Sequence, residues 1–442
     1  MTSMTVSHPD AILHGTIKLP GSKSISNRAL ILQQVSEIPI QLINLSIADD
    51  TIIMQQALQQ GSGTIHLKNA GTCMRFLAAY FAAKEHADVT LLCDERMEQR
   101  PITELVDALN QLGADIEYIN KEGFPPLRIH GKKLKGGTIN TSASVSSQYI
   151  SALMMIAPLC EEGLTINLTG TITSFPYIEM TARMMEQLGW ILHINHRHSF
   201  SIHFPKQMQI SNLEINLKSE ISNPKSQISN LFIEPDWSAA SYWYEMTALS
   251  KECNILLEGL QLDSLQGDAI VAKYMELFGV VTKQEQGSIR LSKKNQNLES
   301  RNKSEIQSPK SEILDLKSTP DLAPTLVVTA AALCIPMILT GLQNLVIKES
   351  NRLEALRTEL TKLGFDVTIA NGRFEVKENL RLKSEISNPK SQISTYSDHR
   401  IAMAFAPLAL IFDSITIEQP EVVEKSYPHF WEDLKSVGFQ LA

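Results

Sequence analysis

The chain has 442 residues, of which 43% are hydrophobic and 20% are charged, and its formal net charge is −8. A chain of this length is expected to form two or more domains, and its composition is that of an ordinary globular protein rather than a disordered or fibrous one. The negative net charge argues against a dedicated nucleic-acid-binding protein. It does not exclude small anionic ligands, because these need only a local cationic pocket.

The cysteines are scattered along the sequence without a C-x-x-C pair, at Cys73, Cys93, Cys160, Cys253 and Cys334. This pattern favours buried thiols in a reducing compartment over a metal site or a disulfide framework. The N-terminal residues do not resemble a signal peptide, and no apolar run reaches the roughly 18 residues of a membrane span. We therefore expect a cytoplasmic protein that does not bind membranes.

Three apolar helices predicted in the first half of the chain begin with polar or basic residues. The segment LPGSKSISNRALIL places Lys23, Ser24 and Arg28 at a helix start, and NAGTCMRFLAAYFAA and SSQYISALMM begin similarly at Asn69 and Ser146. Helix N-termini bind phosphates and carboxylates, although Ser, Thr and Asn also cap ordinary helices. GSKS is not a P-loop, because Ser22 stands where that motif requires glycine before lysine.

A second pattern recurs along the whole chain: an apolar helical period, then glycine, then a short alternating run. The glycines that follow these helices are Gly61, Gly113, Gly189, Gly279, Gly364 and Gly438. Glycine at this position supplies the left-handed backbone that ends a helix. The recurrence predicts duplicated α/β units, of which the first is short, as if a strand or hairpin were missing between Gln60 and Asn69.

The second half of the chain repeats the polar helix starts with more charge. STPDLAPTLVV places Asp321 before an apolar helix, and three further starts contribute Lys348, Glu349, Arg352, Asp398, His399, Arg400 and Lys425. Any one of these could be a solvated helix end or an exposed ion pair. Together they supply both cations and groups able to transfer protons.

Three polar segments interrupt this pattern. LKSEISNPKSQIS occurs identically at 217–229 and 382–394, and a near copy occupies 303–313. These segments are too poor in apolar residues to form a core. We expect insertions in surface loops, where added length costs little stability; a lysine-rich interaction role is the alternative.

Taken in order, ten motifs resemble those of 5-enolpyruvylshikimate-3-phosphate synthases, the enolpyruvyl transferase family. The motifs are LPGSKSISNRAL, NAGTCMR, ERMEQRPI, SVSSQYISALMM, SFPYIEMT, PDWSAASY, Gly267-Asp268, TPDLAPT, KESNRLEAL and YSDHRIAMA. Apart from the insertions, the resemblance spans about residues 12–440. It implies a two-domain inverted α/β barrel built from six repeated βαβαββ-like units, the first shortened. One domain would be discontinuous, joining 1–20 to 234–442, and the other would be 21–233.

The resemblance also implies roles for individual residues. Shikimate 3-phosphate would be bound by Lys23, Ser24, Arg28, Ser146, Ser147, Gln148, Ser174, Tyr177, Asp321, Asn344 and Lys348. Phosphoenolpyruvate would be bound by Lys23, Asn69, Gly71, Thr72, Arg100, Gln148, Arg352, Arg400 and Lys425. The first domain would thus bind shikimate 3-phosphate, whereas the discontinuous domain would supply cations for phosphoenolpyruvate and catalytic acids.

The implied reaction transfers the enolpyruvyl group of phosphoenolpyruvate to the shikimate 5-hydroxyl and releases phosphate, a step of the shikimate pathway. Lys23, Asp321, Glu349 and His399 are the candidate catalytic residues, with Asp321 as the base and either Glu349 or Lys23 as the proton donor. No metal or cofactor is expected. The expected partners are the two substrates and no nucleic acid, and the chain is expected to be a monomer.

Two positions depart from the pattern of that family. Phe76 stands where the family usually has proline, and Cys73 replaces the usual alanine. Because Phe76 follows the loop with Gly71 and Thr72, it is expected to affect the phosphoenolpyruvate pocket and sensitivity to glyphosate, in a direction that the sequence leaves open. The retained Gly71 predicts that glyphosate still competes, and Cys73 is expected to be a packing residue.

Three alternatives stay open at this point. The chain could be a UDP-N-acetylglucosamine enolpyruvyl transferase, which shares the fold. It could be a catalytically impaired substrate-binding relative, damaged by the short first unit and the insertions. It could also be a phosphate-binding scaffold that reuses capped helices. An assay of phosphate release with both substrates is the most informative single experiment. A substrate test or complementation of a shikimate-pathway auxotroph separates the sister transferase, and failure to bind shikimate 3-phosphate in calorimetry would favour the scaffold.

Overall fold

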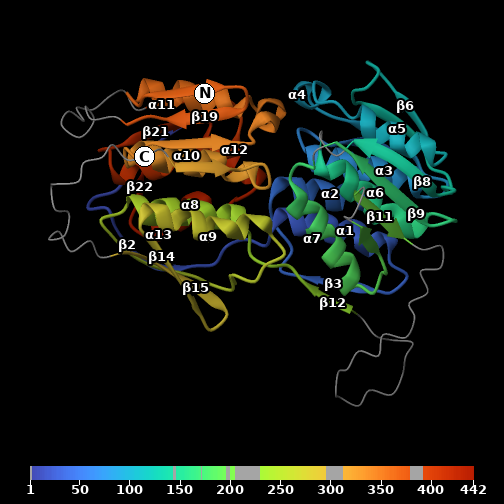
Figure 1. The fold of residues 1–442 in the computed structure, drawn as a ribbon, viewed down its shortest axis with the longest axis horizontal. Helices are drawn as coiled ribbons and strands as arrows, with labels where there is room; N and C mark the ends of the chain where they lie inside the picture. Colours follow the sequence, from blue (N-terminus) through green and yellow to red (C-terminus); the bar gives the residue numbers. More distant parts are fainter. Residues whose placement is uncertain are drawn as a thin grey trace, which may run out of the picture. The chain divides into compact units, whose positions relative to one another are not determined.

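A computed structural model describes residues 2–142, 146–170, 172–195, 200–204, 229–294, 312–378 and 392–442. The chain forms two compact units. The terminal unit joins Met1–Pro20 to Glu234–Ala442, and the central unit is Gly21–Ile233; both are drawn in Figure 1. No helix in the described ranges is both long enough and apolar enough to span a bilayer.

The same order of strands and helices recurs within both units, and the segment from β4 to β7 illustrates it. Strand β4 (Gly63–His66) runs parallel to β5 (Asp88–Leu92), which pairs antiparallel with β7 (Leu127–His130), and β6 (Asp115–Tyr118) completes the hairpin. Helix α3 (Gly71–Ala83) connects β4 to β5, and α4 (Glu95–Glu98) and α5 (Thr103–Gln111) connect β5 to β6. This path is the predicted βαβαββ unit.

The central unit contains a second repeat of this kind and a shortened one. The second has β8 (Gly137–Ser142), α6 (Ser147–Ile156), η1 (Ala157–Leu159), β9 (Leu164–Thr169), α7 (Phe175–Gln187), β10 (His193–Asn195) and β11 (Phe200–Phe204). The shortened one has α1 (Lys23–Val35), β3 (Ile40–Ile43), α2 (Asp49–Gln60) and β12 (Ser229–Phe232). Among the described residues its sheet consists of two strands, the parallel pair β12 and β3.

The terminal unit contains three repeats with the same strand order. The first has β2 (Ile12–Ile17), α8 (Trp237–Leu249), β13 (Glu252–Leu257), η2 (Gly267–Ile270), α9 (Val271–Tyr274), η3 (Met275–Phe278), β14 (Val280–Glu285) and β15 (Ser288–Lys293). The next has β16 (Glu312–Asp315), η4 (Pro320–Leu322), α10 (Ala323–Ala332), β17 (Met337–Thr340), η5 (Gln343–Ile347), α11 (Arg352–Lys362), β18 (Val367–Ala370) and β19 (Arg373–Val376). The last has β20 (Gln392–Ile393), α12 (His399–Phe405), η6 (Ala406–Leu410), β21 (Ile415–Glu418), η7 (Pro420–Lys425), α13 (Phe430–Ser436), β22 (Gln440–Leu441) and β1 (Ser3–Ser7).

The glycines predicted to end helices all have positive φ. The six are Gly61, Gly113, Gly189, Gly279, Gly364 and Gly438. Helix α2 ends at Gly61 and β4 of the next sheet begins at Gly63, so the first repeat lacks a hairpin at the predicted place. The helix before Gly279 differs from the prediction, because it divides into the short α9 and the 3₁₀ helix η3.

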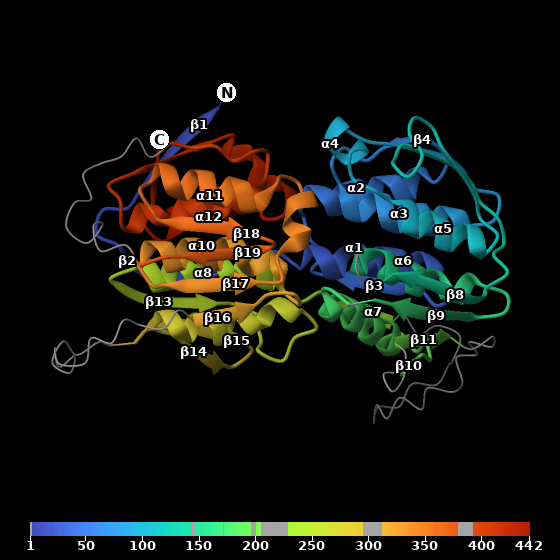
Figure 2. The same ribbon diagram turned by 45° about the horizontal axis from the view of Figure 1, so that its top comes forward.

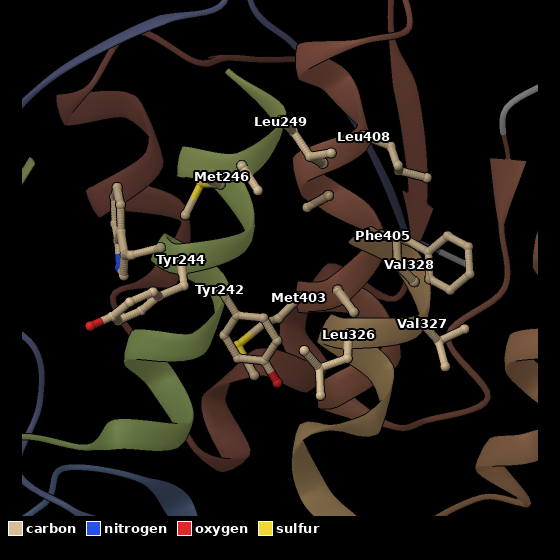
Figure 3. Close-up of a cluster of buried hydrophobic side chains, with 14 of the residues drawn as sticks. Tyr242, Tyr244, Met246, Leu249, Leu326, Val327, Val328, Met403, Phe405 and Leu408 are labelled. Atoms are coloured by element: carbon tan, nitrogen blue, oxygen red, sulfur yellow. The ribbon is translucent and has the colours of Figure 1, made fainter. Parts of the chain in front are cut away.

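The first helix of each repeat forms the core of its unit. In the terminal unit, α8, α10 and α12 pack against one another, and the side chains of Tyr242, Leu326 and Met403 lie together (Figure 3). In the central unit, α1, α3 and α6 pack together in the same way (Figure 2). Every residue of α8 except Ser238 is buried, so this helix is buried from its first turn.

The three polar insertions fall largely outside the described residues. The described parts are Ser229, Glu312–Ile313 and Gln392–Ser394. Ser229 begins β12, Glu312–Ile313 begin β16, and Gln392–Ile393 form β20, which Ser394 follows. The expectation of loops is wrong at these ends, because Ser229, Glu312–Ile313 and Gln392–Ile393 lie in these three strands. At the last of them the residue is not on the surface either, because Ile393 is completely buried. Parallel pairing with β21 stabilises that two-residue strand.

Glu245 of α8 is a buried acid that costs stability. Its side chain is completely buried, and neither carboxyl oxygen has a hydrogen-bond partner among the described residues. Burial raises the pKa of this carboxyl well above its ordinary value. Since the folded state then holds the proton more tightly than the unfolded state, stability falls as pH rises above about 4.3, the unfolded value.

Replacement of this acid by an apolar side chain of similar length should stabilise the protein. We expect Glu245→Met to raise the free energy of unfolding by about 1–3 kcal/mol at pH 8, because no unpaired carboxyl is then buried. The gain should be smaller at pH 5, and urea unfolding at both pH values measures it. The exposed Glu258→Met is the control. If Glu245→Met raises the free energy of unfolding equally at both pH values, the buried carboxyl of Glu245 is not the cause of the lost stability.

Candidate active site

Most of the predicted site residues lie on or beside the first turns of helices; Arg28 lies one turn further along α1, and Lys425 is the last residue of η7. In the central unit they are Lys23, Ser24 and Arg28 of α1, Asn69, Gly71 and Thr72 around the start of α3, Arg100 after α4, Ser146, Ser147 and Gln148 at α6, and Ser174 and Tyr177 at α7. In the terminal unit they are Asp321 in η4, Asn344 in η5, Lys348, Glu349 and Arg352 before and at α11, His399 and Arg400 of α12, and Lys425 of η7.

Arg28 of α1 is a buried cation, with 2% of its surface exposed. Its Nε donates to Thr181 Oγ1 at 2.7 Å, and its Nη2 donates to Ser151 Oγ at 3.0 Å. Its Nη1 donates to the backbone oxygen of Ser24 at 3.0 Å. Burial lowers the pKa of Arg28 to about 10, although Tyr177 acts in the opposite direction and raises it. This pKa is still well above 7, so the guanidinium stays charged at neutral pH.

The starts of α3 and α6 lie side by side. Gln148 Nε2 donates to Thr72 Oγ1 at 3.1 Å, and Gln148 Oε1 accepts from Arg75 Nη1 at 2.8 Å. A Cβ on Gly71 would approach Arg75 Nη1 to 2.7 Å and Arg100 Nη1 to 2.8 Å. Glycine at this position therefore lets two guanidinium groups lie against the helix start, where an anion could accept from both.

Lys23 lies beside an acid that sequence reasoning did not select. Its Nζ is 3.3 Å from Oδ2 of Asp50, which lies in the first turn of α2. Cys73 is completely buried, as expected for a packing residue, and its Sγ donates to the backbone oxygen of Asp50 at 2.9 Å. The thiol and the ion pair thus hold the same turn of α2 in place.

Other predicted residues serve the helix starts themselves. Ser146 Oγ accepts from the backbone N of Gln148 at 3.3 Å, so Ser146 caps α6. Ser174 precedes α7 with a left-handed backbone, φ 54°. Asn69 Nδ2 donates to Asp94 Oδ2 at 3.2 Å. The capping interpretation is therefore correct for Ser146, which does not prevent an anion from binding at the same turn.

Asp321 is the centre of the charged cluster in the terminal unit. Its Oδ1 lies 2.9 Å from Arg352 Nη1 and 3.6 Å from Lys348 Nζ, and its Oδ2 lies 3.1 Å from Arg400 Nη2. Burial alone would raise the pKa of Asp321. The positive charges of Arg400, Lys348 and Arg352 outweigh burial and hold the pKa of this carboxyl well below its usual range.

Arg352 connects this cluster to two further acids. Its Nε donates to Asp398 Oδ2 at 2.7 Å, and its Nη2 donates to Glu349 Oε2 at 2.7 Å. Lys425 Nζ lies 3.6 Å from Glu349 Oε1. Burial would lower the pKa of Arg352, but Asp398, Glu349 and Asp321 raise it above its ordinary value. The arginine therefore stays charged although only 1% of its surface is exposed.

Asp398 fixes the start of α12. Its carboxylate accepts from Ser350 Oγ at 3.0 Å and from the backbone N of Arg400 at 3.0 Å, and it is completely buried. His399 Nδ1 lies 3.7 Å from Asp398 Oδ1. The carboxylate thus orients the helix turn that carries both His399 and Arg400.

A fourth acid reaches the cluster through a hydroxyl group. Ser238 Oγ donates to Asp268 Oδ2 at 2.5 Å and lies 3.4 Å from Arg400 Nη2. Burial, together with the charge of Asp321, raises the pKa of Asp268 to about 6 against the opposing charge of Arg400. Asp268 and Asp321 thus have pKa values shifted in opposite directions within one cluster.

Sequence reasoning gave no site role to Asp50, Ser238, Asp268 and Asp398, although it placed Asp398 at a charged helix start and Asp268 in a motif; all four contact predicted residues or the side chains that pair with them. Each lies at the start of a helix that follows a strand, which is the signal used for the residues that were selected. Within the described part of the chain, no three or more His, Cys, Asp and Glu side chains gather as a metal site requires.

Removal of Arg352 should destabilise the terminal unit, because it takes the main cation from the buried Asp398 and from the half-buried Glu349. We expect Arg352→Met to lower the free energy of unfolding by about 3–5 kcal/mol, measured by urea denaturation. The control is Arg357→Met in the same helix, whose ion pair with Glu354 is exposed and should contribute about 0–1 kcal/mol. Equal losses in the two variants would show that the Arg352 pairs do not stabilise the unit.

Comparisons with known proteins place the chain in a family. A family model described as EPSP synthase (3-phosphoshikimate 1-carboxyvinyltransferase) matches residues 8–64 and 56–434. A relative from Bacteroides fragilis (strain YCH46), named 3-phosphoshikimate 1-carboxyvinyltransferase, is 43% identical over 428 residues, covering 97% of this chain and 96% of the relative. A relative of the same name from Haemophilus ducreyi is 33% identical over 461 residues, covering 97% of each chain.

A solved structure supports the fold. The EPSP synthase from Acinetobacter baumannii is similar with a TM-score of 0.72 and 20% sequence identity, and the match covers 100% of both chains. This likeness confirms the predicted two-domain α/β fold. The helix starts that carry the candidate residues, the family model and the full-length relatives all lead to one conclusion: the chain belongs to the EPSP synthase (3-phosphoshikimate 1-carboxyvinyltransferase) family.

Proposed function

We propose that the chain transfers the enolpyruvyl group of phosphoenolpyruvate to the 5-hydroxyl of shikimate 3-phosphate and releases phosphate. Membership of the family supports this reaction. The observation that carries it is the position of Asp321, a carboxylate in contact with Arg352, Arg400 and Lys348. Addition of a hydroxyl group to an anionic enol needs a base and cations close together.

The proposal assigns the anionic groups of the substrates to the basic helix starts. Arg28 and the hydroxyl-rich turn at Ser146 and Ser147 are assigned to shikimate 3-phosphate, and Arg100, Arg352 and Arg400 to phosphoenolpyruvate. Arginine suits this role because its planar fork binds carboxylate and phosphate with two hydrogen bonds. All the side chains that the proposal needs lie in this one chain, which is expected to act as a monomer.

The reaction is proposed to take two steps. First, the 5-hydroxyl oxygen attacks C2 of phosphoenolpyruvate, Asp321 accepts the hydroxyl proton, and the C3 methylene takes a proton from Glu349 or Lys23. The product is a tetrahedral intermediate with a methyl group. In the second step a methyl proton returns to a base, the C2–C3 double bond re-forms, and the bond between C2 and the phosphate oxygen breaks. Arg352, Arg400, Lys23 and His399 stabilise the negative charge that develops.

The charges around Asp321 explain when this base would become effective. A carboxylate with a strongly lowered pKa is a weak proton acceptor. The cations that lower it, Arg400, Lys348 and Arg352, are the ones assigned to the substrates. Bound phosphate and carboxylate groups bring negative charge to these cations and thereby raise the pKa of Asp321. The base would therefore become effective once the substrates are bound.

The initial rate of phosphate release tests the reaction. We expect phosphate to be released only when phosphoenolpyruvate and shikimate 3-phosphate are both present. No phosphate should be released when UDP-N-acetylglucosamine replaces shikimate 3-phosphate. Release with the nucleotide sugar alone as acceptor would assign the chain to the other enolpyruvyl transferase reaction. Calorimetric binding of shikimate 3-phosphate without any release would identify a catalytically impaired relative, and absence of binding would indicate a scaffold.

The role of Asp321 has its own test. Asp321→Asn keeps the shape of the side chain but cannot accept the hydroxyl proton, so kcat should fall by about 10²- to 10⁴-fold. Calorimetric binding of shikimate 3-phosphate should remain measurable. The matched control is Asp315→Asn, which changes an exposed acid on the preceding strand and should leave kcat unaltered. A near-normal kcat in Asp321→Asn would remove this residue from the base role.

A further inference from the structure

Phe76 lies under the guanidinium group of Arg28. Phe76 belongs to α3 and is completely buried, and Arg28 Cζ lies 5.2 Å from the centroid of its ring. A second ring, that of Tyr177 in α7, has its centroid 5.7 Å from the same atom. Guanidinium groups within about 6 Å of a ring centroid are attracted to its negative face. Two rings from two different helices therefore contact one cation.

Arg28 is a buried cation without an acidic partner among the described residues. Its acceptors are the hydroxyl groups of Thr181 and Ser151 and the backbone oxygens of Ser24 and Tyr177, all of which are neutral. Burial of a charge that no opposite charge offsets is unfavourable. Neutral acceptors and ring faces reduce this cost without cancelling the positive charge, and a positive charge held in this way attracts an anion.

We propose that Phe76 is a positioning residue that sets the affinity of the chain for shikimate 3-phosphate by supporting the guanidinium group of Arg28. The inference rests on the proposed function, in which Arg28 binds that substrate. Phe76 thus acts on the shikimate substrate rather than on the phosphoenolpyruvate pocket that its place in the sequence suggests.

The test separates loss of the ring face from loss of packing. Phe76→Leu keeps an apolar side chain and removes the ring, so the Kd for shikimate 3-phosphate, measured by calorimetry, should rise about 3- to 20-fold. The KM for phosphoenolpyruvate and kcat should change by less than about twofold. The matched control is Phe81→Leu, which removes another completely buried ring from α3, one that has no ring contact with Arg28. This variant should leave the Kd for shikimate 3-phosphate near that of the parent.

A double-mutant cycle makes the test specific to Arg28. In an Arg28→Met background the ring has no cation to support, so adding Phe76→Leu should not raise the Kd for shikimate 3-phosphate further. Fully additive effects, or equal effects of Phe76→Leu and Phe81→Leu, would overturn the proposal. If Phe76→Leu does not fold, Phe76→Met serves in the same cycle, because methionine fills irregular space in a core.

Failure of the inference can be distinguished from failure of the proposed function. If the parent chain releases no phosphate with both substrates, the proposed reaction is wrong. If the parent chain is active but Arg28→Met binds shikimate 3-phosphate as tightly as the parent, the reaction stands and the assigned roles of Arg28 and Phe76 are both overturned.

Discussion

Burial of the helix starts is the constraint on which the rest of the structure depends. The first helices of the repeats, α1, α3 and α6 in one unit and α8, α10 and α12 in the other, pack together as the core of their unit. A helix N-terminus leaves N–H groups without a partner inside the helix, and packing of these first turns, whose residues are buried or half-buried, limits the water that reaches them. Polar and basic side chains on these turns must therefore pair with one another or bind an anion. Duplication of the βαβαββ unit repeats this requirement at each core helix.

The two units meet this requirement differently. In the terminal unit, acids and cations satisfy each other, and the pairs of Arg352 with Asp398 and Asp321 are the clearest case. In the central unit, Arg28 is held by neutral acceptors and ring faces instead. The terminal unit therefore holds a carboxylate, that of Asp321, whose pKa its neighbouring cations keep low. The central unit holds the positive charge of Arg28, which no acidic side chain among the described residues offsets. Both arrangements suit a reaction between two anions.

Features determined by local chemistry could be predicted from the sequence, and features determined by packing could not. Glycine ends a helix through its own backbone, so Gly113 and the others were predictable. The contacts of Asp50 with Lys23 and of Phe76 with Arg28 join different helices, and no local pattern reveals them. Ile393 was wrongly placed in a loop, because the polar composition of its segment hides a short strand that pairs with β21.

A crystal structure with shikimate 3-phosphate and phosphoenolpyruvate bound tests the central claim most directly, because that claim assigns the substrate anions to the cations at buried helix starts. The account predicts anion oxygens within hydrogen-bond distance of Arg400 and of Arg28, with at least one of the ion pairs that Asp321 makes with Arg352, Arg400 and Lys348 lengthened or broken. Both substrates bound away from these cations, with every ion pair of Asp321 intact, would contradict it.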